Sequence, residues 1–138
     1  MLKHLSAIVL TVLLAACAGA PPAPAPPQTP EQELRARVTA YFDALIAQDY
    51  KAAYQFFTPG YRSTWSATDH YQIRPVIGTW LSAEVLGVEC VSEHACDVTV
   101  ATRFRFAQGV VPLGGQEIPM DQKYRWLYTE GDWYHLPR

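Results

Sequence analysis

The chain has 138 residues, with 11 Lys and Arg against 13 Asp and Glu, which gives a formal net charge of −2 at pH 7. This balance argues against a nucleic-acid-binding protein, because such proteins carry a basic excess. The length suits one domain of ordinary size beside a short leader, and the sequence contains no internal repeat.

The first sixteen residues have the pattern of an export signal. Lys3 and His4 precede a brief apolar run that ends in small residues, and this order is typical of segments that direct secretion. The run is shorter than the ~20 apolar residues of a membrane span. Residues 14–17, Leu-Ala-Ala-Cys, resemble the lipobox of bacterial lipoproteins, which implies cleavage before Cys17 and acylation of Cys17. An ordinary secretory signal with an incidental cysteine is the alternative.

Residues 17–29 are expected to form a lipidated cysteine and a tether. The segment is rich in proline and carries no charge, so it favours polyproline II at ~3.1 Å per residue and would hold a domain ~35 Å from the lipid. Ala18 follows the cysteine, which by resemblance to enterobacterial sorting rules favours the outer membrane. We therefore expect a signal over residues 1–16, a tether over 17–29 and a domain over 30–138.

Three helices are expected at the start of this domain. Thr29 and Gln32 form a capping box that begins a helix at Pro30. Asp49 caps a second, shorter helix that Pro59 and Gly60 end, and a further capping box over residues 66–69 begins a third helix that ends near residue 75. The first helix has apolar residues at helical spacing on one face: Leu34, Val38, Tyr41, Phe42, Leu45 and Ile46.

After residue 75 the apolar period changes to two, which is typical of half-buried strands. Residues 98–106 and 120–128 alternate regularly, residues 80–88 do so less regularly, and a last strand over 133–136 follows a turn at residues 130–132. Helices followed by a four-stranded antiparallel meander predict an α+β fold in which the helices cover one face of the sheet.

Two segments resemble the nuclear transport factor 2-like superfamily: AYFDALIAQDYKAAYQFF at residues 40–57 and YRWLYTEGDWYHLP at residues 124–137. The resemblance implies a bent sheet that wraps around helices to form a cone with a pocket. The superfamily includes isomerases, cyclases, dehydratases, transport factors, secretion-system subunits and modules that only bind. The resemblance therefore predicts a fold and not a function.

Cys90 and Cys96 lie between two expected strands, in the segment CVSEHAC. In an exported protein a disulfide is the default pairing, and we expect these residues to be bridged. A metal site with His94 as a third ligand is the alternative, but the spacing fits no zinc pattern, so no metal is expected.

Catalysis, by resemblance to ketosteroid isomerase, would need a carboxylate or histidine that faces the pocket, beside a donor such as Tyr41. The inner positions of the two regular strands carry no Asp, Glu or His; Asp43 is expected to face solvent and His70 to lie at the surface. His135 remains, and it points inward if the last hairpin has a two-residue turn but outward if the turn has three. The sequence thus argues against an enzyme without excluding one.

Two further groups of residues are candidates for binding. Seven residues would either line a pocket or simply fill the cone: Tyr41, Tyr54, Trp65, Tyr124, Trp126, Tyr128 and His135. On the outer sheet face, Arg103, Arg105, Lys123 and Arg125 are expected to form a basic patch that is either merely solvated or docks an anionic partner, such as an envelope protein or a polymer.

The sequence predicts a lipid-anchored envelope protein that acts as a non-catalytic binding or assembly module, with no cofactor. The alternatives are a small ketosteroid-isomerase-like enzyme for an apolar cyclic substrate and a subunit of a secretion or conjugation apparatus. A histidine that converges with a tyrosine inside a real cavity would favour the enzyme. A filled cone with an exposed basic or apolar sheet face would favour binding.

Overall fold

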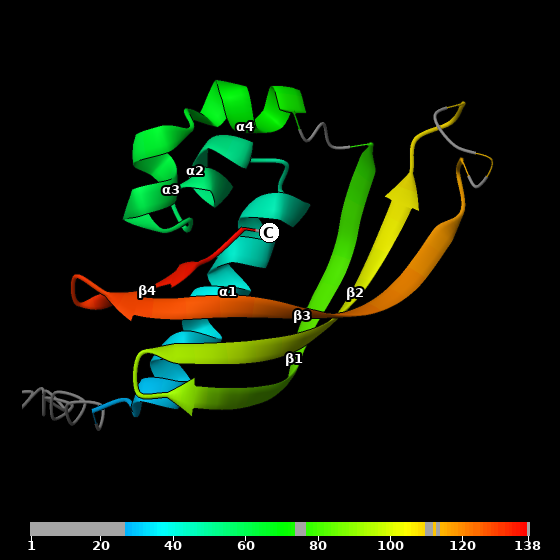
Figure 1. The fold of residues 1–138 in the computed structure, drawn as a ribbon. Coiled ribbons are helices and arrows are strands. Elements are labelled where there is room, and N and C mark those ends of the chain that lie inside the picture. Colours follow the sequence, from blue (N-terminus) through cyan, green and yellow to red (C-terminus); the bar gives the residue numbers. More distant parts are fainter. Residues whose placement is uncertain (1–26, 74–76, 110–111, 113, 138) are drawn as a thin grey trace, which may run out of the picture.

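The computed structural model describes residues 27–73, 77–109, 112 and 114–137 (Figure 1). In these residues four helices precede a four-stranded antiparallel sheet whose strand order is β1-β2-β3-β4. The predicted α+β class is confirmed. The predicted export signal, Cys17 and most of the tether lie outside the described residues.

Helix α1 spans Pro30–Ile46 and begins as the sequence predicts. The Thr29 side chain accepts a hydrogen bond from the Gln32 backbone while the Gln32 side chain accepts one from the Thr29 backbone. Such a cap contributes ~1 kcal/mol. The buried residues lie on the predicted apolar face: Leu34, Val38, Tyr41, Phe42 and Leu45.

Three short helices follow, where two were expected. Helix α2 spans Tyr50–Tyr54 with Asp49 as its cap, α3 spans Pro59–Thr64, and α4 spans Ala67–Ile73. The expectation that Pro59 ends a helix is wrong, because Pro59 begins α3. The Thr58 side chain caps this helix by accepting a hydrogen bond from the Tyr61 backbone N–H. Proline suits the first helical turn because an N–H at that position would have no partner within the helix.

The sheet consists of β1 (Gly78–Ser92), β2 (Ala95–Phe106), β3 (Glu117–Thr129) and β4 (Asp132–His135). In β2 the predicted alternation holds, because Val98, Val100, Thr102 and Phe104 are buried. Strands β1 and β3 are both longer than the ranges expected from alternation. In β1 three register shifts, near residues 81, 86 and 91, interrupt the alternation from which its range was expected.

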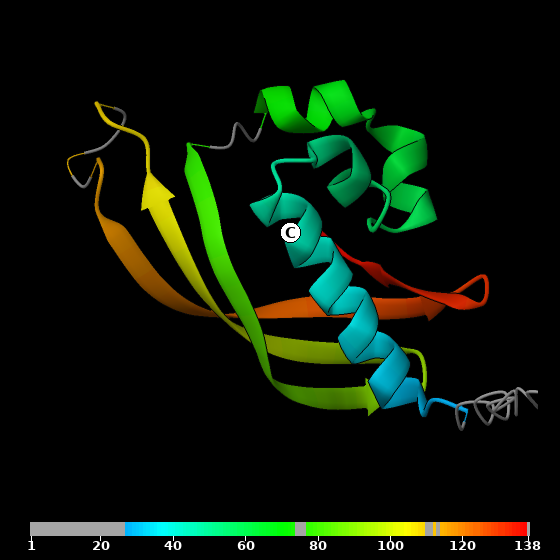
Figure 2. The ribbon, with the colours of Figure 1, turned by 180° about the vertical axis from the view of Figure 1, so that it is seen from behind.

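These bulges accompany a strong bend of the long strands, since each extra residue bends the strand that carries it. Figure 1 shows β1, β2 and β3 curving along their length, and Figure 2 shows α1 lying across the concave side. The core fills this concavity, with Trp126 and Phe42 as its largest fully buried side chains.

The β1–β2 hairpin carries the predicted disulfide. Cys90 and Cys96 are bonded, and they are also paired residues in the antiparallel register. Because both sulfurs are in the bridge, neither is available as a metal-binding thiolate, which removes the alternative of a site with His94.

The short strand β4 connects the sheet to the helical layer. His135 N donates to Phe56 O at 2.7 Å, and Thr58 N donates to His135 O at 3.0 Å. These bonds form an isolated bridge between Phe57 and His135. The segment between α2 and α3 is thereby fixed against the end of the sheet, where the cavity described below lies.

Candidate functional site

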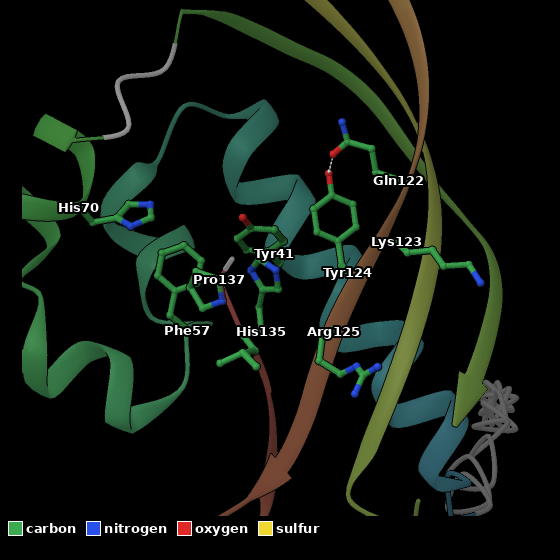
Figure 3. A pocket seen from close by; sticks show the side chains of 10 residues that line it. Tyr41, Phe57, His70, Gln122, Lys123, Tyr124, Arg125, His135 and Pro137 are labelled. Atoms are coloured by element: carbon green, nitrogen blue, oxygen red, sulfur yellow. Dashed lines mark hydrogen bonds between the residues drawn. The ribbon is translucent and has the colours of Figure 1, made fainter. Parts of the chain in front are cut away.

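A cavity of about 360 Å3 lies between the helices and the inner side of β3 and β4 (Figure 3). Leu136 and Pro137 also line it, while the Lys123 and Arg125 side chains point away from the space. Six side chains from five parts of the fold face it: Tyr41, Phe57, His70, Gln122, Tyr124 and His135. The expected cone therefore holds a real cavity and is not completely filled.

His135 points inward because the β3–β4 turn has two residues. Glu130 and Gly131 both have positive φ, at 53° and 82°, as the tight hairpin turns that match strand twist require. This turn pairs Trp126 with His135 and Tyr128 with Trp133. Of the two orientations that the sequence left open, the structure has the inner one, with His135 only 8% exposed.

Aromatic rings surround His135. Its ring centroid lies 5.3 Å from that of Tyr41, 5.5 Å from that of Tyr124 and 5.6 Å from that of Trp126. A histidine therefore does converge with Tyr41, which is the arrangement that would favour the enzyme alternative. Such a ring cluster holds the imidazole in one place and provides flat apolar surfaces for a ligand.

Tyr41 supplies a polar group from α1. The residue is 7% exposed, and its hydroxyl makes no hydrogen bond to another described residue. Burial, together with the nearby Tyr124 and Tyr71 hydroxyls, raises the pKa of Tyr41. The phenol therefore stays protonated and is a hydrogen-bond donor at neutral pH.

Tyr124 and Gln122 form a second polar group on β3. The Tyr124 hydroxyl donates to Gln122 Oε1 at 2.7 Å, and burial raises the pKa of Tyr124 to about 12. The Gln122 side chain thus fixes the direction of this hydroxyl, while its own Nε2 donates to Met120 Sδ at 3.6 Å.

His70 was expected at the surface, and this expectation is wrong. It is 8% exposed on α4, with its ring centroid 4.7 Å from that of Phe57. The Tyr61 hydroxyl lies 2.7 Å from His70 Nδ1. Tyr61 comes from helix α3, which was not expected, and its hydroxyl contacts the inward-facing His70.

The expected pocket residues therefore divide into two groups. Tyr41, Tyr124 and His135 line the cavity, but Tyr54 and Trp126 belong to the buried core, and Tyr128 lies at a different groove. Trp65 is 40% exposed and accepts a hydrogen bond at its backbone carbonyl from the Tyr54 hydroxyl. His70 and Gln122 line the cavity without having been predicted.

The chemistry of the cavity is that of neutral donors and aromatic faces. None of the described residues that line it is Asp or Glu, so no carboxylate base is present there. Nor does any group of three or more His, Cys, Asp or Glu in the described residues have the arrangement of a metal site.

The outer sheet face is not the basic patch that the sequence predicted. Arg103, Arg105, Lys123 and Arg125 do share this face, but each has a carboxylate partner. Glu117 contacts both Arg103 and Arg105, Glu89 lies 2.7 Å from Lys123, and Asp97 makes two hydrogen bonds with Arg125 at 2.6 and 2.8 Å. The face is therefore of mixed charge and is not a basic patch.

The ion pairs of the outer face also shift the pKa values of the groups that form them. The Arg105 and Arg103 guanidinium groups lower the pKa of Glu117, and Glu89 raises the pKa of Lys123. Docking of an anionic partner by the four cations stays a prediction, with a weaker electrostatic basis than the sequence indicated.

Searches for relatives by sequence gave no match to a protein-family model and no match among curated proteins. Solved structures do match. An NTF-2-like protein of unknown function from Shewanella oneidensis has a TM-score of 0.56 at 10% identity, over 78% of this chain and 94% of that one. The chain has a nuclear transport factor 2-like fold.

Two proteins that contain a SEC-C motif also match in structure. The one from Rhodopseudomonas palustris has a TM-score of 0.51 at 21% identity, with 78% of this chain and 75% of that chain covered. The one from Psychrobacter arcticus has a TM-score of 0.52 at 14% identity, with 79% of this chain and 59% of that chain covered. At these identities the likeness establishes the fold alone.

Proposed function

We propose that this protein is a binding module whose ligand is a small, uncharged, planar molecule held in the cavity beside His135. The observation that carries the proposal is the cavity itself, in which aromatic walls meet a few polar groups from different elements. Sites for small molecules typically have this composition and volumes of ~300–1,000 Å3.

The side chains define the ligand chemistry. Tyr41, Phe57 and His135 present ring faces, which favour a flat apolar body. The Tyr41 hydroxyl donates to an acceptor such as a carbonyl or hydroxyl oxygen. An anionic ligand is disfavoured, because Lys123 and Arg125 point to the outer face, where carboxylates engage them.

We also propose that the domain works in the bacterial envelope on a lipid anchor at Cys17. The leader and lipobox pattern support this location, and a disulfide suits an oxidising compartment. Among the described residues, no helix is long and apolar enough to cross a membrane. If Cys17 is the anchor, the Cys17→Ser protein will leave the membrane fraction with its domain folded; retention there would contradict the proposal.

Catalysis is the second candidate, and one observation favours it. His135 and Tyr41 converge inside a real cavity, which is the arrangement that a base and an oxyanion donor would need. This convergence favours an enzyme, but we place binding first because binding requires the cavity alone. Catalysis also requires a base within hydrogen-bond reach of the reacting atom.

The binding experiment uses 2-naphthol as a neutral planar probe, titrated into the full chain by calorimetry. The Tyr41→Phe variant removes only the hydroxyl, so we expect about fivefold weaker binding, which corresponds to ~1 kcal/mol for one hydrogen bond. Tyr134→Phe is the matched control, because Tyr134 contacts Arg37 and Arg62 outside the cavity.

No binding by the wild-type chain, or equal loss in both variants, would contradict the site. The same preparation tests the enzyme candidate. Turnover of an apolar cyclic ketone by the wild type, and its abolition by His135→Gln, would show that the cavity is catalytic.

A further inference from the structure

A second concave site lies at the opposite end of α1 from the start of α2. This hairpin groove has a volume of about 510 Å3 and runs between the first turn of α1 and the end of the β1–β2 hairpin. Leu34, the Cys90–Cys96 bridge, Tyr128 and Trp133 give it an apolar lining. It shares none of the residues that line the cavity beside His135.

The floor of the hairpin groove is aromatic. The Tyr128 and Trp133 rings pack edge to face with their centroids 5.3 Å apart, and His94 lies 6.1 Å from Tyr128. Trp133 is 4% exposed, and its Nε1 has no hydrogen-bond partner among the described residues. Grooves lined by aromatic rings suit proline-rich segments, which dock as preformed polyproline II helices.

This chain contains such a segment, and it enters the domain at the groove. Pro30 lines the groove and is also the first helical residue after the tether. Thr29, just before it, has φ −76° and ψ 156°, which are polyproline II values. Five prolines precede it within nine residues: Pro21, Pro22, Pro24, Pro26 and Pro27.

The acidic residues of the hairpin groove disfavour negatively charged occupants. Glu31, Glu33 and Glu93 line the groove, so it repels phosphate-bearing lipid headgroups and acidic peptides. Residues 18–27 carry no charge, so the proline-rich segment meets no such repulsion.

We propose that the proline-rich segment of this chain, residues 18–27, folds back and occupies the hairpin groove. Covalent linkage makes the docking favourable even if the contacts are weak. A short linker gives an effective concentration of ~1 mM, so a segment with an intrinsic dissociation constant of ~0.1 mM would be docked in about nine molecules of ten. The domain would then be held close to its point of attachment until a competitor releases the segment.

The test places a photoreactive benzoylphenylalanine at Ala23 of the full chain, in expressing bacterial cells. After illumination, mass spectrometry locates the crosslink. We expect it within the same chain, on the peptides that carry His94 and Tyr128. Mixing isotopically light and heavy copies distinguishes this product from a crosslink between two copies.

Two variants and one control sharpen the test. Replacing the five prolines with serine should lower the yield of the groove crosslink about tenfold, because a hundredfold weaker segment would be docked in about one molecule of ten. His94→Ala, at an exposed position, should also lower it without affecting folding. The Ala20→Ser, Ala25→Ser double variant changes the same segment but keeps its prolines, and should crosslink like the parent.

Crosslinks to lipid, to another protein or between light and heavy copies would overturn the proposal. So would crosslinks spread over the surface, no crosslink at all, or an undiminished yield in the proline-free variant.

Discussion

The two faces of the sheet differ in burial and in the contacts that their side chains make. On the inner face, Trp126 and Val98 are completely buried against α1 and its neighbours. On the outer face, Arg103 and Lys123 are mostly exposed and reach carboxylates at the surface. The comparison shows that alternation assigns residues to a face correctly, but that the charge of a face depends on partners from other strands.

The largest expected effect is on the inner face. Trp126→Ala should lower the free energy of unfolding by ~3–5 kcal/mol, since it removes a large buried side chain and leaves a cavity. Thr99→Ala, on the outer face of β2, should change it by less than ~0.5 kcal/mol. Urea unfolding of both variants measures the difference, and similar losses would contradict this division of the sheet.

Two partly buried tyrosines that pack against the core, Tyr71 on α4 and Tyr124 on β3, also predict a loss of stability in alkali. Burial raises the pKa values of Tyr71 and Tyr124 to about 12, whereas an unfolded tyrosine titrates near ~10. The folded chain therefore holds these protons between the two values, and its stability is complete below pH ~10 and falls as pH rises toward ~12. Each retained proton contributes up to ~1.4 kcal/mol per pH unit.

Urea unfolding at several pH values in this window tests the effect. Tyr124→Phe should reduce the slope of unfolding free energy against pH, because it removes one of the retained protons. Parallel slopes for the parent and the variant would show that Tyr124 titrates as in the unfolded chain.

The outer face should give the smallest effects, and they should differ between pairs. Arg125 and Asp97 make two short hydrogen bonds and are 29% and 19% exposed, whereas Lys123 and Glu89 are 53% and 70% exposed. A double-mutant cycle on Arg125 and Asp97 should give the larger coupling, because these side chains are less exposed. The same cycle on Lys123 and Glu89 should give a smaller coupling, which salt reduces further. Equal couplings for the two pairs would contradict the role of burial.

Local patterns predicted what depends on neighbouring residues in the chain. The start of α1 follows from Thr29 and Gln32, and the inner positions of β2 follow from simple alternation. Helix α3 was missed because Pro59 was taken as a stop, although Thr58 followed by proline is also a helix start. That omission hid Tyr61, and with it the inward position of His70.

The ion pairs of the outer face could not be predicted for a related reason. Glu89 lies one residue beyond the range expected for the first strand, and Glu117 lies before the range expected for the third. Bulges in β1 blurred its alternation, so its full length was not visible in the sequence. In the cavity, the alternation places Gln122 on the same face as Tyr124, but alternation alone does not show that the two side chains are hydrogen-bonded.

The ligand site in the cavity beside His135 is tested most directly by an NMR titration of the histidine Cε1–H signals with 2-naphthol. His70 and His135 line the proposed site, while His94 lies at the separate hairpin groove and serves as an internal reference. If 2-naphthol binds in the cavity, we expect saturable shifts of the His70 and His135 signals and an unchanged His94 signal. The Tyr41→Phe variant should bind 2-naphthol more weakly. Shifts at His94 alone, or none at His135, would contradict a ligand site in the cone.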